Sequence, residues 1–252
     1  MRNKSNLEMQ LELEQQDEQP KKISFKRPGR LLNDIKLRIH TQDAQILFGG
    51  YQSKESVGLL MFGKQMANIW KAAAKDDPYA DLYLLKVYDA ILKLRKYFSI
   101  QIEKYQTQLA EHSRHPNLEI TPFVSEEPLV KNLWFGTQYG FMAAQFIADF
   151  DLLMSIFLTA KRVGVSFDKT HVEIKKEATQ NIEKLFSLPF EWVETGITRN
   201  DFKNNTSLSY DVKEKLGKLP QSILDLELRS PFAPDIKSSS KEDENDEPIQ
   251  NE

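Results

Sequence analysis

The stretch that most constrains the fold is residues 35–40, IKLRIH, in which apolar and basic side chains alternate without interruption. Side chains on a β-strand point alternately to opposite faces, so this segment predicts a strand with one aliphatic and one basic face. The basic face carries Lys36, Arg38 and His40. A strand this short is not stable alone. It needs a partner strand, and its cationic face needs an anionic partner.

Signals for two helices follow the predicted strand. Thr41 can cap a helix over residues 42–48, because a threonine hydroxyl accepts a hydrogen bond from the first turn of a helix. The glycine pair that comes next can end this helix. Ser53 can cap a second helix that runs to about Lys75, with apolar side chains repeating every three or four residues on one side.

Charge is distributed unevenly along a chain whose formal net charge is only −3. Residues 21–40 carry seven basic groups and one acidic group, whereas residues 1–20 and 241–252 have net charges of −3 and −5. The positive segment therefore coincides with the alternating strand, and local charge decides whether a surface suits nucleic acid. The basic arm before the strand is interpreted either as a solvated linker or as a contact to the DNA backbone through Lys26, Arg27 and Arg30.

The rest of the chain predicts a helical bundle. Residues 79–111 predict a long helix whose apolar side chains step by three and four, so it should pack along another long helix. Residues 138–163 are apolar almost all round, as expected for a helix at the centre of a bundle. Three shorter helices are predicted over residues 168–186, 209–216 and 220–226.

The acidic segment at residues 76–81, DDPYAD, is interpreted as a helix start rather than as a metal site. Asp77 followed by Pro78 is typical of an N-cap and first helical position, and Asp81 would lie near the positive end of the helix dipole. Residues 198–201 approximate a capping box in which Asp takes the place of Glu or Gln.

Two further acidic residues interrupt the apolar segment 138–163. Asp149 and Asp151 would each need a partner if buried, because an unpaired buried carboxylate is costly. Lys161 and Arg162 are candidate partners through tertiary packing. The two carboxylates are two residues apart and would point in different directions on a helix, which argues against a paired acid–base role.

Several classes of chemistry are excluded by what the sequence lacks. There are no cysteines, so disulfides and thiolate sites are absent. No glycine-rich phosphate loop, dinucleotide fingerprint, HExxH zinc helix or nucleophile elbow occurs. There is no apolar signal-peptide core and no run of about 18 uncharged apolar residues. We therefore expect a cytoplasmic protein that is not an enzyme, spans no membrane and needs no metal or cofactor.

Taken in order, the sequence predicts four regions. Residues 1–29 are a disordered acidic segment and basic arm, residues 30–75 a DNA-binding region, residues 76–236 a helical body, and residues 237–252 a disordered acidic tail. The predicted fold is mainly α. Its N-terminal β-strand forms an intermolecular ribbon of the ribbon-helix-helix kind, and a multi-helix bundle follows.

Six co-linear segments resemble one family of bacterial proteins. They are HTQDAQILFGG (40–50), DDPYADLYLL (76–85), YGFMAAQFIADFDLLMSIFLTAKRVGV (139–165), TGITRNDF (195–202), LGKLPQSIL (216–224) and RSPFAP (229–234). They span most of the chain, from about Leu31 to Asp235. The resemblance is to the AcaB-like transcriptional regulators of conjugative plasmids and integrating conjugative elements. It implies a bacterial DNA-binding regulator of conjugative transfer without catalytic residues.

The order strand, helix, helix over residues 35–75 is similar to that of ribbon-helix-helix repressors and activators. In those proteins, alternate side chains of an antiparallel ribbon read bases and the start of the second helix holds phosphate. By position, the implied base readers are Lys36, Arg38 and His40. Ser53 and Lys54 would lie near phosphate. The first helix is short for that family, and a basic–aliphatic strand is also the pattern of an ordinary surface strand with one wet face.

Two functions stay open from the sequence. In the first, the chain is a homodimeric transcription factor, expected to be an activator, that reads double-stranded DNA with a ribbon in the major groove. Its helical body holds the dimer together or recruits a partner such as RNA polymerase. In the second, the chain is a helical scaffold or adaptor of the conjugation apparatus. Charge, strand pattern and resemblance together favour the regulator.

Overall fold

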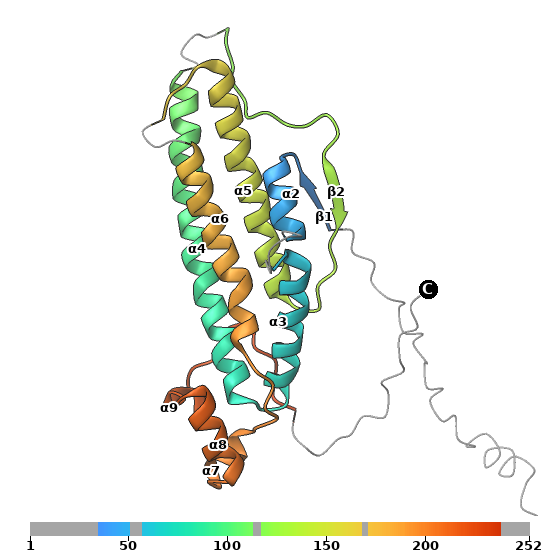
Figure 1. Ribbon diagram of the computed structural model, residues 1–252, viewed down its shortest axis with the longest axis vertical. Helices are drawn as coiled ribbons and strands as arrows, with labels where there is room; N and C mark the ends of the chain where they lie inside the picture. The colour runs from blue at the N-terminus through green and yellow to red at the C-terminus, as the bar shows by residue number, and fades with distance from the viewer. Residues whose placement is uncertain (1–34, 51–56, 113–116, 168–170, 238–252) are drawn as a thin grey trace, which may run out of the picture. The chain divides into compact units, whose positions relative to one another are not determined.

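Long helices packed side by side make up most of the structure (Figure 1). The structure, a computed structural model, describes residues 35–50, 57–112, 117–167 and 171–237. A small antiparallel sheet of two strands, one of them at the start of the described chain, accompanies the helices. The prediction of a mainly α fold with a short N-terminal strand is therefore confirmed.

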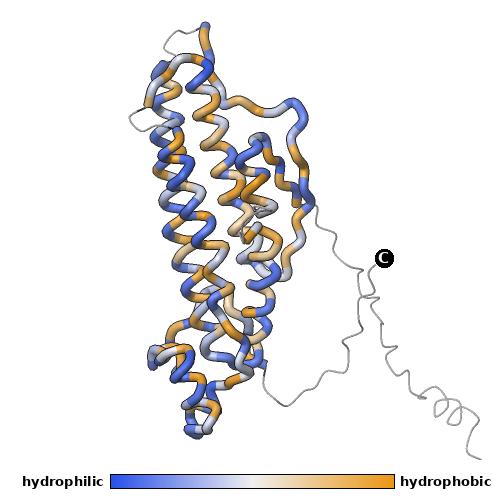
Figure 2. The backbone as a smooth tube through the Cα atoms, in the orientation of Figure 1, coloured by the Kyte–Doolittle hydropathy of each residue, from blue (hydrophilic) through white to orange (hydrophobic). Residues whose placement is uncertain are grey.

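The bundle is built around α5 (Gln138–Val163). The long helices α4 (Pro78–Glu111) and α6 (His171–Ser187) run alongside it, and α3 (Leu59–Ala74) packs against both α4 and α5 (Figure 1). In Figure 2 α5 is predominantly apolar, whereas α4 and α6 alternate between hydrophilic and hydrophobic residues. The predicted seam of α4 faces this core, and its fully buried side chains include Leu84, Val87, Ile91 and Phe98.

By length and composition alone, α5 would qualify to cross a membrane. However, 61% of its most apolar 18-residue window is buried inside the protein. Four helices and a strand pack on it, so its apolar character is explained by its central place in the bundle.

Several helix ends lie where local sequence signals predict them. Asp77 is the N-cap of α4, with its side chain accepting hydrogen bonds from the backbone N–H groups of Tyr79 (2.8 Å) and Ala80 (3.1 Å). Gly164 ends α5 with a φ of +77°, a conformation that glycine adopts at little cost. Thr198 and Asp201 form the predicted capping box at the start of α7 (Arg199–Lys203).

The predicted strand has a partner strand that its sequence did not reveal. β1 (Lys36–Ile39) pairs antiparallel with β2 (Leu129–Asn132) of the same chain. A connection over residues 117–136 leads toward α5 and contains β2. This connection returns along the bundle to β1, and the backbone N–H of Leu133 donates to the carbonyl of Ile35 at 2.8 Å. One chain thus supplies both strands of this pair.

The helix after α2 (Gln42–Gly49) starts later than predicted. Gly58, rather than Ser53, is the N-cap of α3, and it has no side-chain capping bond. Gly58 lies against the backbone at the end of α2, where an added Cβ would come within 2.6 Å of the carbonyl carbon of Gly49. This close approach of two helix ends requires glycine. Thr41 caps α2 and Gly50 ends it, as predicted.

Short helices complete the far end of the bundle. They are the 3-10 helix η1 (Leu188–Glu191), α7, α8 (Ser207–Leu216) and α9 (Gln221–Leu224). The chain then returns to α3, where the backbone N–H of Lys237 donates to the carbonyl of Ala74 at 2.9 Å.

Candidate nucleic-acid interface

The alternating strand has one buried and one exposed face, as its sequence predicts. Leu37 and Ile39 are buried in the core, whereas Lys36 and Arg38 are exposed. Arg38 forms no ion pair with any residue that the structure describes. A cationic side chain is thus held outward on a strand whose other face is fixed by apolar packing.

The second strand adds two residues that the sequence analysis missed. Asn132 lies directly opposite Lys36 and Val130 directly opposite Arg38 in the register. Opposite residues of an antiparallel pair project to the same face, so these four side chains share the outer face of the ribbon. Asn132 and Val130 are both exposed. No local sequence signal identifies them, because LVKN is too short to show a period.

His40 occupies a different environment from the other two predicted readers. It is half-buried just beyond the end of β1, and its Nδ1 accepts a hydrogen bond from the backbone N–H of Ser125 at 3.1 Å. This bond ties β1 to the segment that leads into β2. Only Nε2 is then left on the ring for a contact with DNA.

A buried carboxylate of the central helix fixes the junction between β1 and α2. Asp151 accepts hydrogen bonds from the backbone N–H groups of His40 (2.8 Å) and Thr41 (2.7 Å) and from the Thr41 hydroxyl (2.7 Å). The predicted partners Lys161 and Arg162 are therefore wrong for Asp151, and both are exposed. The end of β1 lies against α5, so the backbone N–H groups at this end supply the hydrogen bonds that the buried carboxylate needs.

The second predicted carboxylate, Asp149, is half-buried. Burial raises the pKa of Asp149, and the nearby positive charge of Arg95 opposes this effect. Its charged neighbour therefore comes from α4 and not from the end of its own helix.

An aromatic wedge anchors the ribbon where β2 ends. Phe135 lies between Gly63 of α3 and Gly140 of α5, and a Cβ added at either glycine would overlap its side chain. The close approach that Gly63 permits is therefore with Phe135 of the same chain.

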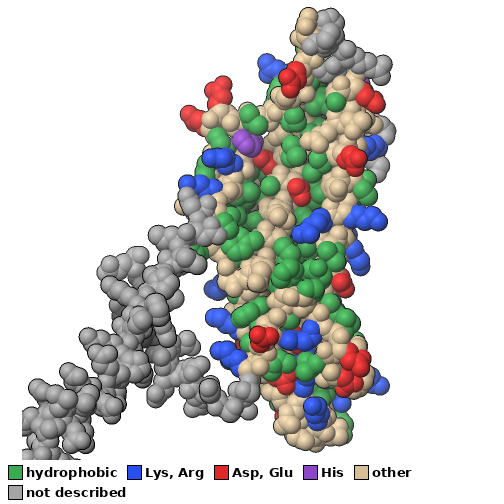
Figure 3. Space-filling view, turned by 180° about the vertical axis from the view of Figure 1, so that it is seen from behind, with side chains coloured by type: hydrophobic (Ala, Val, Ile, Leu, Met, Phe, Trp, Pro, Cys, Tyr) green, Lys and Arg blue, Asp and Glu red, His purple; other side chains and the backbone are tan. Residues whose placement is uncertain are grey.

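Charges near the ribbon are mixed. Lys131 is exposed between Val130 and Asn132, while Glu126 and Glu127 are exposed just before β2. Figure 3 likewise shows, on the face in view, side chains of both signs scattered among apolar ones. The ribbon thus presents a local pair of basic side chains rather than part of a broad positive surface.

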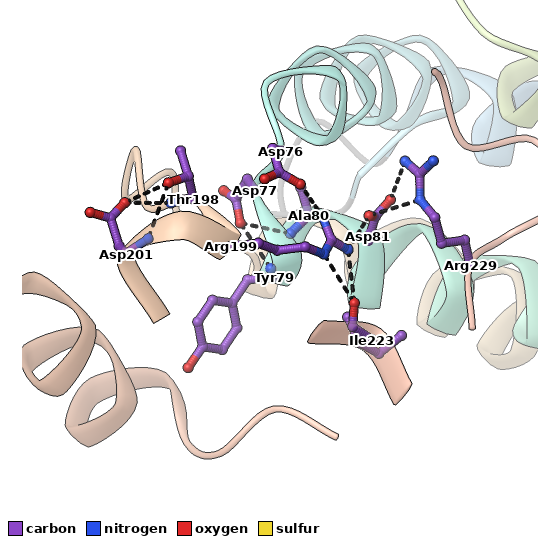
Figure 4. Close-up of polar contacts among 10 residues, drawn as sticks. All are labelled: Asp76, Asp77, Tyr79, Ala80, Asp81, Thr198, Arg199, Asp201, Ile223 and Arg229. Atoms are coloured by element: carbon purple, nitrogen blue, oxygen red, sulfur yellow. Dashed lines mark hydrogen bonds and ion pairs between the residues drawn. The ribbon is translucent and has the colours of Figure 1, made fainter. Parts of the chain in front are cut away.

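The acidic segment at the start of α4 belongs to a buried ion-pair cluster with two arginines (Figure 4). Arg199 contacts Asp76 (2.7 Å), Asp81 (2.5 Å) and the carbonyl of Ile223 (3.0 and 3.1 Å). Arg229 binds both carboxylate oxygens of Asp81 at 2.9 Å. Guanidinium groups thus occupy these carboxylates, and within the described ranges no group of three acidic or histidine side chains is arranged to hold a metal.

The remaining predicted DNA contacts lie outside the described residues. They are Lys26, Arg27, Arg30, Ser53 and Lys54.

Comparison with known proteins shows a family match over most of the chain. The family model for the transcriptional regulator AcaB matches residues 27–237. A crystal structure of selenomethionine-containing AcaB from uropathogenic E. coli aligns with a TM-score of 0.43 and 15% sequence identity, covering 78% of this chain and 97% of that one. No protein of curated function matches the chain.

Proposed function

The chain belongs to the family of AcaB transcriptional regulators, and from this premise we propose that it regulates transcription by binding DNA in a sequence-specific way. The outer face of the β1–β2 ribbon lies in the major groove, which is wide enough to admit a two-stranded ribbon.

One observation carries this proposal. Lys36 and Arg38 are exposed side by side on a strand whose opposite face is buried in the core. A basic face on a rigid support suits base reading, because a side chain that reads a base edge needs a fixed distance from the sugar–phosphate backbone.

The roles that we propose follow from the chemistry of each side chain. Arg38 makes a bidentate contact with guanine, which is the commonest specific contact in the major groove. Lys36 reads a neighbouring guanine, and His40 adds a contact through Nε2. The DNA backbone is held by the basic arm and by residues that precede α3 in the sequence. The residues proposed for this are Lys26, Arg27, Arg30, Ser53 and Lys54.

The wider biological role is also a proposal, and it rests on the family resemblance. The protein acts in the bacterial cytoplasm as an activator of conjugative-transfer genes. Two copies bind as a homodimer to an inverted repeat, because a two-fold protein presents two identical reading surfaces. The helical body supplies either the dimer contact or a surface for a partner such as RNA polymerase.

A fluorescence-anisotropy titration with DNA from upstream of conjugation genes tests the ribbon. The protein and the Lys36→Ala/Arg38→Ala variant are titrated at several salt concentrations, with scrambled DNA beside them. We expect tight selective binding that weakens steeply with salt, because each neutralised phosphate releases counterions. The double variant should lose this binding while remaining folded.

A matched control removes the same charge elsewhere. Lys71 and Lys75 are exposed near the C-terminal end of α3, so Lys71→Ala/Lys75→Ala should bind DNA as the unmodified protein does. An equal loss of DNA affinity in both double variants would mean that the net charge of the protein, and not the position of the basic residues, determines binding. If Lys36→Ala/Arg38→Ala binds DNA as tightly as the unmodified protein, the ribbon is not the DNA-binding surface. If none of the proteins binds DNA, the alternative function as a helical scaffold is favoured.

A further inference from the structure

The outer face of the ribbon contains four side chains of three chemical kinds, contributed equally by the two strands. Lys36 and Arg38 come from β1, and Val130 and Asn132 come from β2. Val130 is 45% exposed although it is an aliphatic residue in a sheet. Val130 therefore places an aliphatic side chain, accessible from outside the chain, between the basic and amide groups of this face.

Each of these side chains has a different complement in the major groove. Asn pairs with the N6 and N7 of adenine through its amide, an aliphatic group packs on the methyl of thymine, and Arg or Lys binds guanine. The amide of Asn132 forms no hydrogen bond within the part of the chain that the structure describes. Both its donor and its acceptor are therefore available to a base edge.

The face is held in a defined register. β1 and β2 each span four residues, and Leu133 continues the pairing through its bond to Ile35. Beneath the ribbon, Leu37 and Ile39 are buried, and Phe135 is wedged between Gly63 and Gly140. The relative positions of Arg38, Val130 and Asn132 are thus set by packing within one chain.

We propose that β2 supplies half of the base recognition: Asn132 specifies an adenine, and Val130 contacts the methyl of a thymine. This inference rests on the proposed DNA binding by the ribbon. It adds that each chain reads its own half-site with two strands, and that the preferred half-site contains adenine and thymine beside the guanines read by β1.

Chemically altered DNA tests the two contacts one at a time. Preferred sites are first selected from random DNA with the full-length protein. The conserved adenine is then replaced by 7-deazaadenine, which lacks the N7 acceptor, and the thymine by uracil, which lacks only the methyl. We expect roughly a tenfold loss of affinity for the first change and about a fourfold loss for the second.

Variants of β2, combined with the altered DNA, complete the test as double-mutant cycles between one side chain and one base. Asn132→Ala should bind the unaltered site about as weakly as the unmodified protein binds the 7-deazaadenine site, with no further loss when both changes are combined. Val130→Ala should behave in the same way with uracil. Both residues are exposed, so neither variant is expected to unfold the protein.

Asn68→Ala and Val172→Ala are the matched controls, because they remove an exposed amide from α3 and an exposed valine from α6. Both should keep the affinity and base preference of the unmodified protein. If Lys36→Ala/Arg38→Ala abolishes binding but the β2 variants keep the base preference, the inference about β2 is overturned while the proposed function stands. Selected sites that require no adenine or thymine also overturn it. If the unmodified protein selects no DNA at all, the proposed function falls and this inference falls with it.

Discussion

Asp77 shows how one residue can stabilise a helix start and still be unfavourable as an ion. It is buried, it caps α4 through one carboxylate oxygen, and its Oδ2 has no hydrogen-bond partner among the described residues. Burial raises the pKa of Asp77 from 3.8 to about 6, despite the bonds from Ala80 and Tyr79. The native protein therefore binds a proton on Asp77 in a pH range where the unfolded chain does not.

The resulting pH dependence has a definite sign. Because the folded-state pKa is the higher one, the contribution of Asp77 to stability is largest below pH 3.8 and falls as pH rises to about 6. Asp77→Asn keeps a capping oxygen but does not ionise. From pH 4 to pH 7, the unmodified protein should lose up to roughly 3 kcal/mol relative to this variant. Urea unfolding of both proteins at several pH values measures the difference, and parallel curves would contradict the assignment.

Asp151 should be far more sensitive to substitution than Asp149. Asp151→Ala leaves two backbone amides and the Thr41 hydroxyl without their acceptor in a buried site, so we expect a loss of roughly 3–5 kcal/mol in the free energy of unfolding. Asp149→Asn, two residues away on the same helix, should cost about 1 kcal/mol or less. Denaturant titration distinguishes them. Equal costs would mean that the bonds to the strand contribute little.

At the scale of the element, the ribbon depends on space left by two glycines. At Gly140, an added Cβ would lie 2.7 Å from the Cβ of Phe135 and overlap its Cγ, whereas at Gly63 the overlap is with ring atoms further out. We expect Gly140→Ala to cost roughly 1–3 kcal/mol, and Gly63→Ala less, because the outer ring atoms can shift more easily than the base of the side chain.

The control for this prediction is another glycine in a helix. Gly49 has open space around the position of an added Cβ, so Gly49→Ala should be neutral within about 1 kcal/mol. In a Phe135→Ala background, the cost of Gly140→Ala should disappear, since the group that it displaces is gone. Thermal unfolding of the single and double variants measures this coupling, and a cost that persists without Phe135 would exclude the wedge.

Elements whose limits are set by neighbouring residues were predictable from sequence. The α4 start at Asp77 and Pro78 and the α5 end at Gly164 are local signals, and the structure agrees with both. The start of α3 was predicted too early. Its limit at Gly58 is set by the approach of α2, which no pattern within the helix itself records.

At the scale of the whole molecule, the Arg199 cluster joins the start of α4 to the C-terminal part of the chain. Arg199→Ala would leave Asp76 without its arginine and Asp81 with only Arg229. Loss of one partner in a buried ion pair costs roughly 3–5 kcal/mol, and we expect residues after 199 to become the preferred sites of limited proteolysis. Arg199→Lys should not restore stability, because an ammonium group does not replace the forked contacts.

Arg229→Ala provides the comparison. Its side chain is 21% exposed, against 4% for Arg199, so water can partly replace its contacts and its cost should be smaller. Proteolysis that is unchanged in both variants would show that the cluster does not hold the C-terminal segment in place.

The contacts that sequence reasoning missed join residues that are far apart in the chain. Asp81 meets Arg199 and Arg229 across 118 and 148 positions of the chain, and Asp151 meets Thr41 across 110. The sequence indicated that the carboxylates at Asp149 and Asp151 needed partners, but helix periods and capping patterns reach only a few residues. The same limit hid β2, whose four residues acquire meaning only opposite β1.

The connection between the two strands has a consequence for how the protein is made. All of α2, α3 and α4 lie between β1 and β2 in the chain, and the helix that buries β1 follows β2. A ribosome that has translated the basic strand has therefore made only half of the ribbon and none of its support. Pairings over such long sequence separations form late, after the intervening chain has ordered. On the emerging polypeptide, the surface proposed to meet DNA would be among the last parts to be assembled.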